Sequence, residues 1–165
     1  MERSQWYLGV PNGVVLCVDR VKGDLMSGRY YHSYSRDPVI FQDMDEALLQ
    51  MEQLFDELHF PHPGNSTRTF AGRRREEFPE QERMKIMKDE ELLDMHGDLG
   101  TFIIRVQHRQ NSSWQGRITW MEEDKTVCFR SVWEMIRLIA GALDTVSGPE
   151  DGLKEVQWPT DEERK

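Results

Sequence analysis

The stretch from Phe102 to Leu143 constrains the fold most, because its apolar pattern changes from the period of a strand to that of a helix. Apolar and polar residues alternate from Phe102 onward and again over 114–121, and a short segment at 126–129 follows a polar turn. Ser131 then stands three residues before Glu134, the spacing of a capping box. Behind it, apolar residues recur at helical spacing at Val132, Met135, Ile136, Ile139, Ala140 and Leu143. The stretch therefore predicts three antiparallel strands followed by a helix.

A second copy of this pattern lies upstream. A shift of 88 residues places 14–58 on 102–146 without a gap, and Asp43 then falls on the helix start at Ser131. Seven positions are identical in the two copies: Val18/Val106, Gly28/Gly116, Arg29/Arg117, Val39/Val127, Phe41/Phe129, Glu46/Glu134 and Asp56/Asp144. We therefore predict an α+β fold of two tandem βββα units, each a three-stranded antiparallel sheet with one helix. The alternative is two unrelated segments that share only the order of strands and helix.

The predicted division of the chain follows from this repeat. Residues 1–60 form the first unit, 61–100 a polar and partly helical linker, 101–147 the second unit and 148–165 an acidic tail. Two prolines and Gly64 end the first helix, since proline cannot continue a helix. Charged and apolar residues mixed over 80–95 predict one loosely amphipathic helix or two short ones.

Composition indicates a globular chain, with 38% hydrophobic and 31% charged residues. No apolar run approaches the roughly 20 residues of a membrane span, and residues 1–5 do not resemble a signal peptide. We expect a cytoplasmic protein. Cys17 and Cys128 fall within predicted strands, which favours two buried free thiols.

The net charge of -9 is unevenly distributed. Residues 1–60 carry 5 basic and 10 acidic side chains, whereas residues 101–147 carry 6 basic and 5 acidic ones. An acidic first unit suits a partner whose surface is positive, because complementary charge favours association. The candidate contacts of this kind are Asp19, Asp24, Asp37 and Glu52.

The second unit offers a different candidate surface. The strand pattern places arginine and amide side chains on one face of its sheet, and these residue types contact bases and phosphates in nucleic-acid complexes. The candidates are Arg105, Gln107, Arg109 and Arg117, with Asn111 and Trp114 at the rim. The alternatives are a solvated face or a face that packs the two units together.

Motifs for catalysis or metal binding are weak. The spacing of His59 and His62 is found in metal sites, but no cysteine or carboxylate constellation completes this one. We recognise no nucleophile motif, and the short segment 97–100 does not match a glycine-rich phosphate loop. We therefore expect no enzyme activity, cofactor or metal, and keep a cryptic hydrolase or metal protein only as an outside alternative.

The motifs Arg109-Gln110-Asn111, Trp114-Gln115-Gly116 and Phe129-Arg130-Ser131 resemble small acidic proteins of gut clostridia and their mobile elements. This resemblance implies no activity, although small acidic proteins of mobile elements include inhibitors that occupy the nucleic-acid channels of defence nucleases. The order of elements in the second unit is also similar to the DNA-binding domains of plant ethylene-response factors, which read the major groove with a sheet.

Together these patterns predict a non-catalytic binding protein. The leading hypothesis is a regulator or inhibitor that acts by protein–protein contact, for example on a nucleic-acid-handling enzyme such as a CRISPR-type nuclease. The second hypothesis is a nucleic-acid-binding protein that uses the sheet face of the second unit.

Overall fold

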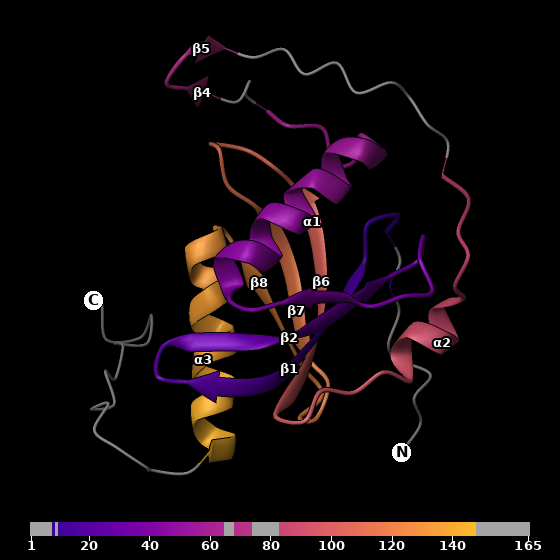
Figure 1. Cartoon of the computed structure of the whole chain (residues 1–165), viewed down its shortest axis with the longest axis vertical. Helices are drawn as coiled ribbons and strands as arrows, with labels where there is room; N and C mark the ends of the chain where they lie inside the picture. The colour runs from indigo at the N-terminus through magenta and orange to yellow at the C-terminus, as the bar shows by residue number, and fades with distance from the viewer. Residues whose placement is uncertain (1–7, 9, 65–67, 74–82, 148–165) are drawn as a thin grey trace, which may run out of the picture.

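The computed structural model describes residues 8, 10–64, 68–73 and 83–147 (Figure 1). The predicted acidic tail and parts of the predicted linker lie outside these ranges. The described residues form an antiparallel sheet of six strands with three helices and a separate two-stranded hairpin, so the predicted α+β class is confirmed.

The first part of the chain forms β1 (Val14–Lys22), β2 (Leu25–His32), β3 (Val39–Phe41) and α1 (Met44–Leu58). The middle forms β4 (Arg68–Thr69), β5 (Gly72–Arg73) and the short helix α2 (Asp89–Leu93). The last part forms β6 (Gly100–His108), β7 (Gln115–Trp120), β8 (Lys125–Phe129) and α3 (Val132–Ser147).

The sheet is continuous, in the order β3-β2-β1-β6-β7-β8, and is not divided into two three-stranded sheets. Strand β1 pairs with β6 from Val14–Ile104 to Val18–Gly100. The residues of β1 from Val14 to Val18 are all fully buried, and an apolar run of this kind is typical of a strand covered on both faces. Such a strand would be costly at an edge, which explains why the two halves join here.

The pairing registers of the two halves coincide when 88 is added to each residue number. Val15 pairs with Tyr31 in the first half, and Ile103 pairs with Thr119 in the second. Both hairpins are irregular at the same place, after Val18 and after Val106. Between β1 and β6, Val15 pairs with Ile103, its own counterpart, and Val14 and Leu16 pair with each other's counterparts, Ile104 and Phe102. This is the self-complementary pairing of a two-fold interface.

Glycine is required for steric reasons at two corresponding positions of the halves, Gly28 and Gly116. A Cβ added to Gly28 would lie 2.0 Å from the carbonyl oxygen of Cys17, and one added to Gly116 would lie 2.0 Å from that of Arg105. Real side chains do not tolerate this distance to a backbone atom. The close approach of the strands therefore requires glycine in both places.

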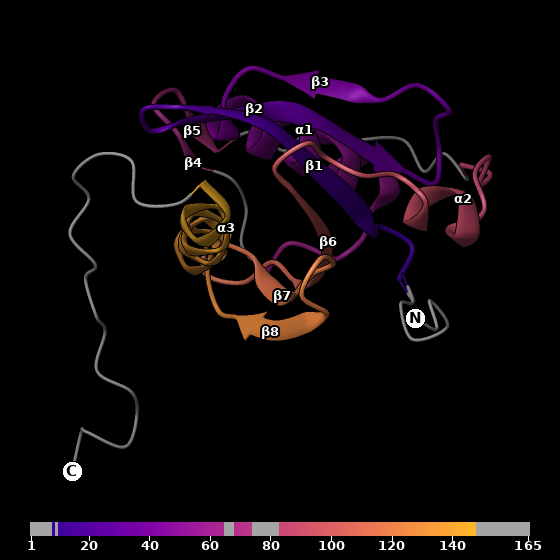
Figure 2. The same cartoon turned by 90° about the horizontal axis from the view of Figure 1, so that it is seen from below.

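Helices α1 and α3 pack on one face of the sheet, and Figure 2 shows β1–β3 and β7–β8 on opposite sides of the view because the sheet twists strongly. The Asp43 carboxylate accepts a hydrogen bond of 2.8 Å from the Glu46 amide, and Ser131 Oγ accepts one of 3.1 Å from the Glu134 amide. These contacts confirm the predicted helix starts. The core includes Tyr30, Phe41, Phe55, Phe102, Phe129 and Met135.

The opposite face, called the outer face here, is covered over its centre by Leu8, Met87 and Leu92, which pack on β1 and β6. Helix α2 is shorter than the helix predicted over 80–95. Among the described residues of that range, the Ile86 and Met87 amides instead donate to the Ser33 carbonyl at 2.7 and 3.0 Å. Tertiary hydrogen bonds thus hold this part of the chain in a non-helical form.

A glycine substitution tests this packing. We expect Gly116→Ala to lower the free energy of unfolding by about 3 kcal/mol, because the strands must move apart to admit a Cβ. Gly141→Ala is the control, since Gly141 lies in α3 with open space around it, and it should stabilise by about 1 kcal/mol. Urea unfolding measures both, and equal effects of the two substitutions would contradict the steric explanation.

Candidate functional site

The outer face of β6, β7 and β8 is the candidate binding surface. Arg105 of β6 lies opposite Arg117 of β7, and Arg117 lies opposite Cys128 of β8, so the three side chains form a row on one side of the sheet. Arg117 and Cys128 are exposed and Arg105 is half-buried. We call this row, with the exposed Gln107 and Thr126, the arginine face.

The arginine face concentrates positive charge. Like charges directly opposite each other in a sheet destabilise each other. Burial lowers the pKa of Arg105 below its usual range, and the nearby charge of Arg117 lowers it further. Because both effects disfavour the charged form, an anion placed beside the two guanidinium groups would be stabilising.

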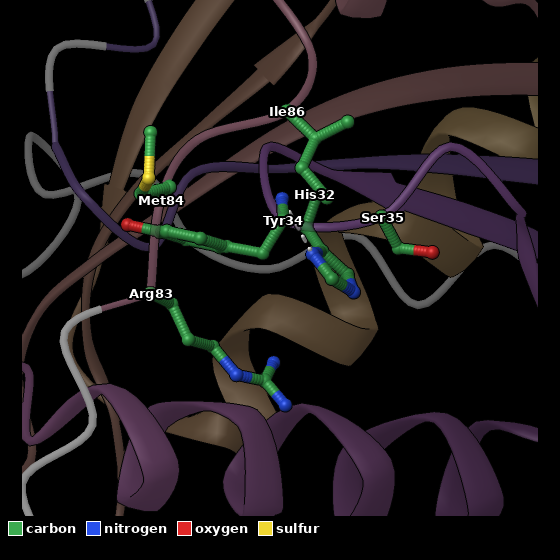
Figure 3. A pocket seen from close by; sticks show the side chains of 6 residues that line it. All are labelled: His32, Tyr34, Ser35, Arg83, Met84 and Ile86. Atoms are coloured by element: carbon green, nitrogen blue, oxygen red, sulfur yellow. Dashed lines mark hydrogen bonds between the residues drawn. The ribbon is translucent and has the colours of Figure 1, made fainter.

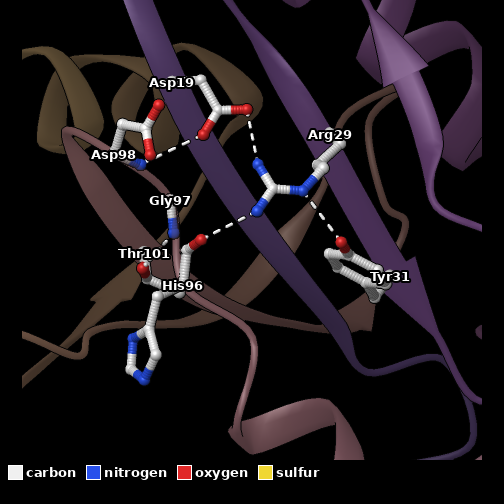
Figure 4. A network of polar contacts seen from close by, with 7 residues as sticks. All are labelled: Asp19, Arg29, Tyr31, His96, Gly97, Asp98 and Thr101. Carbon is white, nitrogen blue, oxygen red and sulfur yellow. Dashed lines mark hydrogen bonds and ion pairs between the residues drawn. The ribbon is translucent and has the colours of Figure 1, made fainter.

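The corresponding arginine of the first half is neutralised within the protein (Figure 4). The Arg29 guanidinium donates to Asp19 at 2.5 Å, to the Tyr31 hydroxyl at 2.8 Å and to the His96 carbonyl at 2.9 Å. The hydrogen bond to Asp19 raises the pKa of Arg29. Asp19 also accepts a hydrogen bond of 3.0 Å from the Asp98 amide. This network fastens the segment after α2 to the sheet.

The second half has an arginine, Arg117, at the position of Arg29, but different residues surround it. Gln107 stands at the position of Asp19, Thr119 at that of Tyr31 and Arg105 at that of Cys17. Within the described ranges, Arg117 makes no ion pair. The same backbone register therefore pairs Arg29 with Asp19 in the first half and leaves the corresponding Arg117 exposed in the second.

Arg109 was predicted on this face, but the structure places it under α1, where 3% of it is exposed. Its Nε donates to the Pro61 carbonyl at 2.7 Å, and its Nη1 contacts Asp56 at 2.6 Å and Glu52 at 3.1 Å. The strand β6 ends at His108, so the alternation that put Arg109 on the outer face stops one residue earlier. Arg109 joins the second half to helix α1.

Trp114 is also buried, although a position at the rim of the face was expected. Its indole Nε1 donates to Glu52 at 2.6 Å, and its ring packs edge-on against Phe55 with the centroids 5.2 Å apart. Glu52, Asp56, Arg109 and Trp114 thus form one group, the Arg109 cluster. Its members hold the structure together and are not free to bind a partner.

The remaining candidates are divided. Asn111 is exposed, but its φ is positive, 54°, and asparagine adopts this backbone conformation more readily than most residues. The turn after β6 is therefore sufficient reason for an asparagine at this position. Of the four acidic candidates, Asp19 and Glu52 have the intramolecular partners described above. Asp24 and Asp37 are exposed in the turns before and after β2. Only these two remain available for contact with another molecule.

The two cysteines differ in exposure. Cys17 is fully buried, and burial raises the pKa of its thiol to about 12. The expectation of a buried Cys128 was wrong, because β8 is an edge strand and Cys128 faces outward beside Arg117. Strand propensity alone could not indicate this, since exposure depends on where the strand lies in the sheet.

A hollow of about 570 Å³ is lined by His32, Tyr34, Arg83 and neighbouring side chains (Figure 3). His32 Nδ1 accepts a hydrogen bond of 3.1 Å from the Tyr34 amide. Burial, with the nearby charge of Arg83, lowers the pKa of His32 to about 4. Arg83 itself pairs with Glu57 at 2.7 Å. His32 is therefore a neutral, structural acceptor at physiological pH.

The described part of the chain contains no group of three or more His, Cys, Asp or Glu that could hold a metal ion. His59 caps α1 with a left-handed backbone. A membrane-spanning helix needs about 20 apolar residues, and no helix in the described ranges meets this requirement.

Comparison of the chain with protein-family models, curated proteins and solved structures finds no match.

The Arg109 cluster can be tested by stability. We expect Arg109→Met to lower the free energy of unfolding by about 2 to 3 kcal/mol, because it removes several hydrogen bonds and leaves two carboxylates close together. Arg117→Met, on the exposed face, should change it by less than about 0.5 kcal/mol. Chemical unfolding compares the two, and the opposite order would show that the roles of these arginines are reversed.

His32 predicts a pH dependence of stability. Its pKa of about 4 in the fold lies below the unfolded value of 6.5, so the unfolded chain binds the extra proton first and stability falls as pH drops from 6.5 to 4. The loss should be on the order of 3 kcal/mol. Urea midpoints measured from pH 4 to 7 should fall less steeply for His32→Asn, which keeps an acceptor for the Tyr34 amide. His62→Asn, at an exposed side chain, is the control and should follow the wild type.

Proposed function

We propose that this protein is a non-catalytic binding protein that regulates or inhibits a protein partner, and that it contacts carboxylates of that partner through the arginine face. The observation that supports this proposal is the exposed Arg117, which lies opposite Arg105 in the sheet and makes no ion pair within the described residues. A carboxylate of a partner placed beside this guanidinium would be favourable, because opposite charges attract across an interface. The corresponding residues Asp19 and Gln107 support the same proposal. Asp19 pairs with Arg29 in the first half, whereas the uncharged Gln107 cannot neutralise Arg117 in the second.

A protein partner suits this surface better than nucleic acid. Trp114, the aromatic side chain predicted at the rim of this face, is buried and cannot stack on bases there. An exposed acidic turn, 122–124, adjoins the strands of the face, and the whole chain carries a charge of -9. A long phosphate backbone would meet repulsion on either side of the two arginines, whereas a few carboxylates on a folded partner would not.

The exposed Asp24 and Asp37 suit a partner whose surface also carries positive patches. A CRISPR-type nuclease, which must hold a nucleic acid in a basic channel, remains a prediction for that partner. Direct nucleic-acid binding through Arg105, Gln107 and Arg117 is the competing outcome of the test below.

We also infer that the segments β1–α1 and β6–α3 are tandem copies of one βββα unit. The coincidence of their registers at a shift of 88 residues supports this inference, as does the shared requirement for Gly28 and Gly116. Two copies paired through their first strands have the geometry of a two-fold dimer in a single chain. The arginine face lies on the second copy, whereas in the first copy Asp19 pairs with the corresponding Arg29.

Cys128 provides a direct test. It is exposed beside Arg117 while the only other cysteine, Cys17, is buried, so a thiol-reactive photo-crosslinker will label the arginine face. In nuclease-treated lysate of the source organism, the labelled protein should crosslink to a discrete protein. The added variant Arg117→Glu should abolish this crosslink. Arg36→Glu, at an exposed arginine away from the face, should leave it unchanged.

A second labelling position controls for chance capture. Cys128→Ser combined with Leu49→Cys moves the label to the exposed side of α1, and the same crosslink should then be lost. A titration with mixed-sequence nucleic acid at about 150 mM salt should show no binding tighter than about 10 μM. Submicromolar, salt-sensitive binding that Arg117→Glu removes would refute the protein-partner proposal and establish the nucleic-acid alternative.

A further inference from the structure

The two edges of the sheet differ in how they are protected. The sheet ends in β3 and β8, and within the described residues no strand pairs with the far side of either (Figure 2). β3 has three residues and follows Pro38, and short length and proline both protect an edge from other chains. β8 has five residues without a proline, and its single charged residue, Lys125, stands at its start. β8 is therefore the edge open to another strand.

The hydrogen bonds of β7 determine which way the backbone of β8 points. The Met121 amide donates to the Thr101 carbonyl at 3.0 Å, which makes these two residues a hydrogen-bonded pair of β6 and β7. Such pairs alternate along antiparallel strands, so Thr119, two residues before Met121, also bonds toward β6. The intervening alternate residues of β7, among them Ile118, bond toward β8.

The backbone of Val127, opposite Ile118, therefore bonds to β7. Its neighbours Thr126 and Cys128 point their N–H and C=O groups away from the sheet. The side-chain oxygens of Thr119 and Thr126 lie 2.8 Å apart, which fits the closer approach of a pair without backbone hydrogen bonds. β8 thus offers two outward donors and two outward acceptors, all within the strand.

The side chain of Val127 is also left open. It lies on the helix-bearing face, since its partner Ile118 belongs to the core there, yet 46% of it is exposed. The corresponding Val39 of β3 is packed against the core. Beside Val127 an apolar groove of about 290 Å³, lined by Trp120 and Leu138 among others, separates it from α3.

We propose that two copies of this chain pair through β8, antiparallel and with Val127 opposite Val127 of the second copy. Thr126 then lies opposite Cys128 of the second copy, and each such pair exchanges two hydrogen bonds, which satisfies every outward group of β8. A register centred one residue earlier would need Asp124, whose φ of 49° is not extended. One centred a residue later would need Arg130, which lies outside the strand.

Charge favours the antiparallel direction. The start of β8 is acidic, because three acidic residues at 122–124 outweigh Lys125, and its end carries the exposed Arg130. The contact of Arg130 with Glu134, at 3.6 Å, is long. Antiparallel pairing brings the acidic turn of each copy toward Arg130 of the other, whereas parallel pairing would bring the two acidic turns together.

The proposed pairing has a two-fold axis perpendicular to the sheet. Such an interface is self-complementary and closes, so association stops at a dimer. Both helix-bearing faces then lie on one side and both arginine faces on the other. The dimer is independent of the proposed partner, and in the crosslinking experiment above a product of twice the mass of the chain would identify it.

Sedimentation equilibrium of the full chain tests the dimer. The contact is small and each chain carries a charge of -9, so we expect a Kd on the order of 100 μM. Cys128→Pro removes an outward N–H and should weaken the dimer by about tenfold or more, while proline at such a position of an edge strand is compatible with the fold. Ile40→Pro, at the corresponding position of β3, is the matched control and should dimerise like the wild type.

Oxidation tests the register. Val127→Cys in a Cys128→Ser background should form a disulfide-linked dimer, because the two residues at 127 face each other with their Cβ atoms close. Wild-type Cys128, which faces Thr126 of the second copy, should form much less. Ile40→Cys in the same Cys128→Ser background is the control and should stay unlinked.

Three outcomes would overturn the proposal. The first is a wild type that remains monomeric up to about 1 mM. The second is a folded Cys128→Pro that dimerises as tightly as the wild type. The third is a disulfide that forms more readily through Cys128 than through a cysteine at 127.

A surface variant keeps the test decisive if Cys128→Pro does not fold. Arg130→Glu should weaken the dimer by about fivefold, because it places like charges together at both ends of the paired strands. Arg36→Glu, at an exposed arginine away from β8, should have no effect. Equal dimer affinities of these two variants would also overturn the proposed pairing.

Discussion

The pairing of β1 with β6 is the contact on which the rest of the structure depends. It joins the two halves into one sheet through backbone hydrogen bonds that are buried on both faces. Because the pair is antiparallel and matches Val15 with its own counterpart Ile103, it brings α1 and α3 to the same face of the sheet. The opposite face then has a central apolar strip, which Leu8, Met87 and Leu92 cover. A polar substitution in this strip would destabilise both halves, because a buried polar group without a hydrogen-bond partner is costly.

The two halves illustrate how one backbone arrangement can carry opposite electrostatics. In the first half Asp19 neutralises Arg29, and the network that results fastens a covering segment to the sheet. In the second half Gln107 and Arg105 leave the corresponding Arg117 displayed. Since the registers are the same, the difference arises from side chains alone. The first arrangement stabilises the fold, and we propose that the second binds a partner.

The order of strands and helices, the helix starts and the glycine positions could be predicted from the sequence, because each depends on neighbouring residues. The outward positions of Arg105, Gln107 and Arg117 could also be predicted, since strand alternation determines them. Arg109 and Trp114 could not, because their burial depends on Glu52 and Asp56, which are more than fifty residues away in the chain. The exposure of Cys128 depended on the place of β8 at the edge of the sheet.

The sequence by itself determined the local features of this protein: the strand periods, the capped helices, the glycines and the match of pattern between residues 14–58 and 102–146. These features are encoded over a few neighbouring positions and need no knowledge of the whole. Only the tertiary structure decided that the two halves share one sheet and which arginines are paired or exposed. Those outcomes depend on which distant segments meet, because burial and charge pairing are properties of the contacts between segments.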